Sequence, residues 1–145
     1  RWALRRNDPD SWYTPAKSPE IDNLIKKNDT LFKDSLDRYK YSDRYPENSM
    51  EYYRSQAEIY LTSLEKKLIA SNYLLGDSIS LADVAIFPFI RQFSLVDKVW
   101  FEASPYLNLR RWLNNFLDSK NFFAVMKKED VWKQENNKSA SMIKI

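Results

Sequence analysis

The sequence predicts an all-α fold, a bundle of helices, and two observations carry this prediction. The chain has a single glycine among its 145 residues, so it offers little material for the tight turns that join strands. Its apolar residues recur at intervals of three and four positions, which is the period of an amphipathic helix. A chain of this length suits one domain and can bury a sizeable core.

The first part of the chain predicts a short helix, a linker and a long helix. Residues 1–8 are expected to form the last turns of a helix that begins upstream, and residues 9–17, which contain two prolines, a linker. A long helix is expected from Ser18, a candidate N-cap, to about Tyr41. The residues expected on its core face are Ile21, Leu24, Ile25, Leu31, Phe32, Leu36 and Tyr39.

A second long helix follows after a short connection. It is expected to begin near Asn48, with Glu51 at the reciprocal capping position, and to end before Gly76. The residues expected on its core side are Met50, Tyr53, Ala57, Tyr60, Leu61, Leu64 and Leu68.

Residues 81–96 differ from the other segments because they are apolar on nearly all sides. This pattern predicts a central helix that the others wrap, with a kink at Val84 to Pro88. Shorter helices are expected over residues 97–102, after Ser104-Pro105 and after Ser119.

The domain organisation follows from these elements. The helical domain is expected to span residues 18–132. Residues 133–145 are polar and show no periodicity, so they are expected to form a flexible tail.

The strongest local signal is the sequence YLLGDSISLADVA over residues 73–85. Ser80 and Asp83 have the spacing of an N-capping box, in which each side chain accepts the backbone amide of the other residue. Ile79 can pack on Val84 one turn into the helix as a hydrophobic staple. We therefore interpret Asp83 as a structural carboxylate and not as a general base.

This segment closely resembles the stretch that opens the central helix of the glutathione S-transferase carboxy-terminal domain, with Gly76, Ser80 and Asp83 at matching positions. The resemblance covers roughly residues 15–130. Residues 1–7 (RWALRRN) resemble the end of the third helix of the family's thioredoxin-like amino-terminal domain. The resemblance implies that this glutathione-binding domain, with its catalytic Ser, Cys or Tyr, is missing from the sequence.

The resemblance also implies a function for the full-length protein. It would conjugate glutathione, its co-substrate, to a small apolar electrophile, and this chain would shape the electrophile site but be inert alone. No catalytic residue and no cofactor are expected in this chain. The substrate-site candidates are Trp12, Phe89, Arg91 and Phe93, because the central helix borders the electrophile cleft in the family.

A homodimer is expected for the full-length form, as is common in the family. The face near Trp2, Trp12, Phe89 and Phe93 is expected to be an apolar patch that the missing domain would cover.

Other interpretations remain open at this point. The chain could be a helical protein–protein interaction module without catalysis, or a stand-alone structural remnant. Trp12 could pack on the first long helix, and Arg91 could be a last-turn cation that complements the helix dipole.

Composition argues against several further classes. With no Cys and no His, the chain has no disulfide, thiol nucleophile, Cys/His zinc site or histidine base, and no metal site is expected. No apolar run reaches the roughly 18 residues of a membrane span, so we expect a cytoplasmic protein without a membrane partner. The formal charge is +3, but residues 11–126 hold 15 basic and 15 acidic residues, so no nucleic-acid partner is expected.

Overall fold

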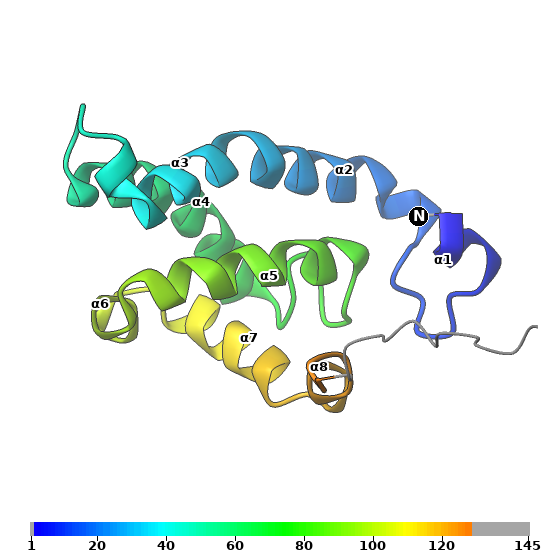
Figure 1. Cartoon of the computed structure of the whole chain (residues 1–145). Coiled ribbons are helices and arrows are strands. Elements are labelled where there is room, and N and C mark those ends of the chain that lie inside the picture. Colours follow the sequence, from blue (N-terminus) through cyan, green and yellow to red (C-terminus); the bar gives the residue numbers. More distant parts are fainter. Residues whose placement is uncertain (1, 129–145) are drawn as a thin grey trace, which may run out of the picture.

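The computed structural model of the chain describes residues 2–128, and the regular elements in this part are helices (Figure 1). The described residues pair extended backbone only at an isolated bridge between Tyr73 and Gly76. The all-α prediction is therefore confirmed. The predicted end of the domain at Trp132 and the predicted tail, residues 133–145, lie outside the described residues.

The helices surround one core. The body of the bundle consists of α2 (Ser18–Lys27), α3 (Lys33–Lys40), α4 (Met50–Ala70), α5 (Leu81–Val96) and α7 (Leu107–Leu117). The smaller elements are α1 (Trp2–Arg6), α6 (Lys98–Ala103), α8 (Lys120–Val125) and single turns over Pro15–Lys17, Asn28–Phe32 and Ser42–Arg44. Both α3 and α7 pack on α4 and on α5. Figure 1 shows α5 between the α2–α3 stretch and the α7–α8 stretch.

The first long helix contains a wider turn that the sequence pattern did not predict. Residues 18–40 are helical, but Asn28–Phe32 form a π turn between α2 and α3. A π turn rotates each residue about the helix axis by a smaller angle than an α turn does. Residues in the turn therefore lie at different positions around the helix from those that a regular α period predicts. Leu31, expected in the core, is 71% exposed, whereas Phe32 is buried. The prediction for Leu31 is wrong because it extended an unbroken helical period through this turn.

Tyr60 of α4 supports the π turn. Its hydroxyl donates a hydrogen bond to the carbonyl oxygen of Leu24 at 3.1 Å, inside the core. Burial raises the pKa of Tyr60, so this hydroxyl stays protonated and remains a donor at physiological pH.

The start of α2 differs from the predicted cap. Lys17 and not Ser18 occupies the N-cap position, and the Ser18 hydroxyl lies 3.1 Å from the hydroxyl of Tyr13.

The N-cap of α4 lies one residue later than the expected Asn48, so Glu51 does not occupy the reciprocal capping position. This N-cap is Ser49, whose hydroxyl accepts the amide of Tyr52 at 3.1 Å. Glu51 lies in the first turn, where hydrogen bonds with its own backbone amide and with Ser49 lower the pKa of its carboxyl. The predicted core residues of this helix are buried except Met50, which is half-buried.

Helix α7 is capped by a residue from a different helix. Ser104 and Pro105 do not begin it; it begins at Leu107, and no side chain at its own N-cap position binds the first turn. The carboxylate of Glu65 on α4 instead accepts the amides of Asn108 and Leu109 at 3.1 and 2.7 Å. A carboxylate at a helix N-terminus also meets the positive end of the helix dipole.

A buried carboxylate joins the loop before α5, the start of α5 and α7. Asp83 is 0% exposed. Its Oδ2 accepts the amide of Ser80 at 2.9 Å and the hydroxyl of Ser80 at 2.6 Å. Its Oδ1 accepts the amide of Leu74 and the indole N–H of Trp112, each at 2.9 Å. These four donors satisfy the carboxylate and are in turn satisfied by it, which removes the penalty of burying each of them.

The loop between α4 and α5 is held by a second, non-local contact. Gly76 has φ of 131°, a conformation that L side chains rarely adopt. The Lys17 ammonium donates to the carbonyl oxygen of the preceding Leu75 at 2.8 Å, and a Cβ on Gly76 would lie 3.6 Å from this nitrogen. The glycine is therefore required by its backbone conformation rather than by crowding.

We expect Asp83→Ala to destabilise the chain by at least about 2 kcal/mol, because it strands buried donors of Ser80, Leu74 and Trp112. Chemical denaturation measures this loss. The control is Asp77→Ala, an exposed residue with contacts of 3.4 Å to Asn72, which should cost less than about 0.5 kcal/mol. An unchanged denaturation midpoint for Asp83→Ala would refute this prediction.

Glu65→Ala should destabilise the chain by about 1–2 kcal/mol, since the first amides of α7 lose their acceptor. Glu102→Ala is the matched control, because Glu102 is exposed and its distance to Lys98 is 3.6 Å. That variant should stay within about 0.5 kcal/mol of the wild type. Equal losses for the two variants would show that Glu65 does not act as a cap.

Candidate functional site

One face of α5 is not covered by the described helices. Pro88, Gln92 and Leu95 are exposed, Leu95 by 57%. Successive residues of an α-helix are turned by about 100°, so these three share one stripe, which we call the open face of α5. In Figure 1, α5 runs across the front of the bundle with α4 behind it. The expectation that other helices wrap α5 on every side is therefore wrong within residues 2–128.

The position of Pro88 fits this exposure. A proline inside a helix leaves the carbonyl oxygen one turn earlier without its amide donor. On an open face that oxygen lies near solvent, whereas on the opposite face it would be stranded in the core.

The opposite face of α5 belongs to the core, and Phe93 lies there. Its side chain is 1% exposed. Its ring centroid lies 5.1 Å from that of Tyr39, 5.9 Å from Phe32 and 6.0 Å from Trp100. Of the four substrate-site candidates, Phe93 is thus enclosed by other rings and has no free surface for a ligand.

Phe89 and Arg91 lie on the two sides of the open face. Phe89 is half-buried and packs on the edge of the core. Arg91, also half-buried, places its guanidinium carbon 5.5 Å from the ring centroid of Phe122 on α8, a cation–π contact. Arg91 precedes the last turn of α5, so its partner is this ring and not the end of the helix.

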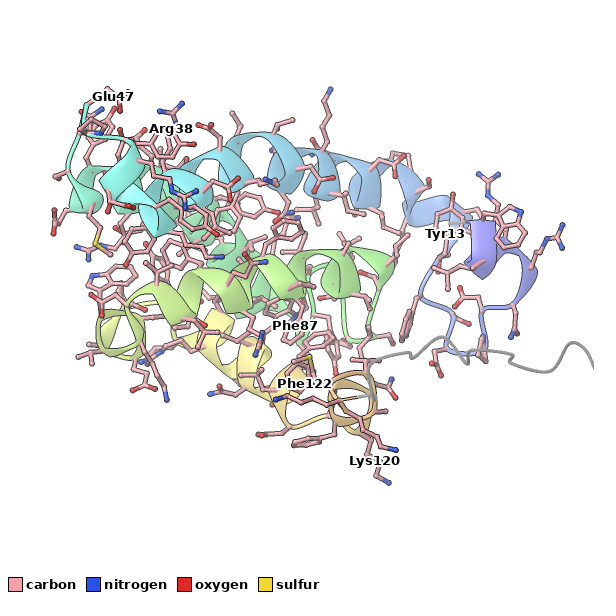
Figure 2. The ribbon with its side chains drawn as sticks, viewed as in Figure 1. Tyr13, Arg38, Glu47, Phe87, Lys120 and Phe122 are labelled. Carbon is pink, nitrogen blue, oxygen red and sulfur yellow. The ribbon has the colours of Figure 1, made fainter. Side chains whose placement is uncertain are left out.

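Trp12 lies in a different place, a pocket at the start of α5 that we call the Trp12 pocket. Its volume is about 360 Å³. The residues that line it come from the linker, the loop before α5, α5, α7 and α8: Trp12, Tyr73, Ile79, Val84, Phe87, Asn115, Phe116, Ser119, Asn121, Phe122 and Val125. Figure 2 shows Phe87 and Phe122 in the same corner between α5 and α8, while Lys120 points away from it.

Hydrogen bonds hold Trp12 at this pocket. The Asp8 carboxylate accepts the amides of Trp12 and Tyr13 at 2.9 and 2.8 Å. The carbonyl oxygen of Trp12 accepts the amide of Leu81, the first residue of α5, at 2.8 Å. That amide has no acceptor within its own helix, so the linker supplies the missing partner. Ile79 and Val84, which were predicted to form a hydrophobic staple, both line the pocket.

The aromatic residues of α5, α7 and α8 that form this pocket were not predicted as site residues from the sequence. A signal was present, because Val84, Phe87 and Arg91 are spaced by three and four residues and form a stripe separate from Ile86 and Ile90. Which helix would meet that stripe is a tertiary property that the local spacing does not contain.

A second hollow lies between the α2–α3 stretch and α4. This groove has a volume of about 580 Å³ and is lined by Lys27, Thr30, Leu31, Phe32, Asp34, Ser35, Gln56, Ile59, Tyr60 and Ser63. Two of its apolar residues are largely exposed, Leu31 on the π turn and Ile59, which is 68% exposed. The groove is thus a surface feature and not part of the core.

Two carboxylates of the chain cap helices. Asp83 is occupied by four donors, and Asp97 accepts the amide of Trp100 at 2.9 Å as the N-cap of α6. Within residues 2–128 no group of three or more acidic side chains is placed to hold a metal ion. In the same part of the chain, no helix combines the length and the apolar character needed to cross a membrane.

Comparisons with known proteins give one match. A family model described as "Glutathione S-transferase, C-terminal domain" matches residues 43–115, from the turn before α4 to α7. Searches of curated proteins and of solved structures give no significant match.

Leu95→Glu should lower the binding of a hydrophobic fluorescent dye to the chain by about half, because it places a charge on the open face of α5. Ile69→Glu, an exposed apolar residue at the end of α4, should leave dye binding unchanged. Dye titration of the three proteins measures the difference. The same loss in both variants, or no dye binding by the wild type, would contradict an apolar surface centred on this face.

Proposed function

Because the chain belongs to the family of glutathione S-transferase C-terminal domains, we propose that it supplies the helical half of the electrophile-binding cleft of a glutathione transferase. The observation that carries this proposal is the open face of α5, which the described helices leave uncovered. Phe89 lies on one side of this face and Arg91 on the other. A thioredoxin-like domain packed beside this face would complete a cleft, and the open face of α5 would form its apolar wall.

In this proposal the chain binds and does no covalent chemistry. Phe89 offers a half-buried ring, and Arg91, whose guanidinium lies over the Phe122 ring, offers one cation beside it. Desolvation by such a wall favours transfer of an apolar electrophile from water. Glutathione and the group that lowers the pKa of its thiol belong to the upstream domain, so this chain alone is inert and provides no cofactor site.

Two further parts of the proposal concern the state of the full-length protein. We propose that it is a homodimer and that it acts in the cytoplasm. The exposed apolar residues Leu31 and Ile59 beside the groove support an interface outside the electrophile cleft. The same groove supports the second candidate function, a helical interaction module without catalysis.

The full-length protein with its upstream domain tests the proposal. It should conjugate glutathione to a model electrophile, and Phe89→Asp should lower kcat/KM about tenfold with unchanged affinity for glutathione. Phe123→Asp is the control, because Phe123 is 64% exposed on α8 and lies outside the cleft. Absence of conjugation, together with loss of a protein complex in Ile59→Asp, would reject the transferase and support the interaction module.

Calorimetric titration tests the remaining claim, that the isolated chain does not bind glutathione. We expect no measurable heat, since the groups that hold the peptide belong to the other domain. Micromolar binding would contradict this and would point to the cationic N-terminal residues Arg1, Arg5 and Arg6.

A further inference from the structure

We propose that the Trp12 pocket is a binding site for a small, neutral, planar aromatic molecule, separate from the open face of α5. The linker and the helices α5, α7 and α8 form the pocket, so its binding can be tested on this chain without glutathione. The proposal therefore goes beyond the transferase function and can hold or fail independently of it.

The size and walls of the pocket support a ligand with one or two rings. A volume of about 360 Å³ lies in the usual range of small-molecule sites, which are mostly apolar with a few polar groups. Trp12, Tyr73, Phe87, Phe116 and Phe122 supply aromatic surface, and a planar ligand can meet such rings by stacking or edge-to-face contact.

The rings hold one another in place, so the pocket is preformed. Phe87 stacks on Phe116 with centroids 4.9 Å apart, and Phe122 meets Phe87 edge-on at 5.6 Å. Tyr73 meets Phe116 edge-on at 6.3 Å. A site whose walls are fixed by their own packing loses less side-chain entropy when a ligand enters.

The polar groups of the pocket indicate an uncharged ligand. None of the lining residues is charged. The hydroxyl of Ser119 is engaged within its own turn, donating to the Phe116 carbonyl oxygen at 2.7 Å and accepting the Phe122 amide at 3.1 Å. The exposed amides of Asn115 and Asn121 are the groups that can bind a hydroxyl or carbonyl of the ligand.

The experiment titrates 2-naphthol into the complete chain and follows methyl and amide chemical shifts. We expect saturable binding, with the largest shifts at Ile79, Val84 and Val125. Naphthalene-2-sulfonate should bind at least about tenfold more weakly, because no lining residue is charged and the nearby Arg91 guanidinium is already engaged with the Phe122 ring. Phe122→Leu should weaken naphthol binding at least about tenfold through loss of a ring contact, whereas Leu107→Ala, at an exposed residue of α7 outside the pocket, should not change it.

Several results would overturn the proposal. These are no shift up to the solubility limit of naphthol, shifts centred on Phe89 and Leu95, or equal binding of the sulfonate. If Phe122→Leu fails to fold, the location of the wild-type shifts decides the question.

Discussion

The buried carboxylate of Asp83 is the interaction on which the arrangement of this chain depends. One oxygen takes both donors of Ser80, and the other takes the Leu74 amide and the Trp112 indole. The loop before α5, the start of α5 and the more distant α7 are thereby fixed to one point inside the core. All four donors have their acceptor on this one side chain, so none of them is buried without a hydrogen bond.

Both candidate sites are built outward from that point. Asp83 fixes the start of α5. There the amide of Leu81 donates a hydrogen bond to the carbonyl oxygen of Trp12, which holds the linker against α5 and places Trp12 at the pocket. Trp112 anchors α7 at the same carboxylate, and its neighbour Phe116 forms a wall of that pocket. The open face of α5 is then what remains after its other sides have been packed.

Local signals predicted the elements well and their partners poorly. The bounds of α5 and the burial of Asp83 could be predicted because both depend on local features. These are the spacing of Ser80 and Asp83 and the apolar run of the 16-residue helix. The cap of α7 by Glu65 and the bonds of Asp83 to Leu74 and Trp112 join segments that no local pattern connects. Leu31 was misplaced for a different reason, because a π turn breaks the period on which its assignment rested.

Native-state hydrogen exchange tests the central role of Asp83 most directly. If its carboxylate fixes these segments, the Leu74 and Ser80 amides and the Trp112 indole N–H exchange only by global unfolding, with protection equal to that of the α4 core. The exposed Asn72, two residues before Leu74, exchanges by local opening. Fast, denaturant-independent exchange at Leu74 and Trp112 would show that the loop and α7 move freely and would contradict this account.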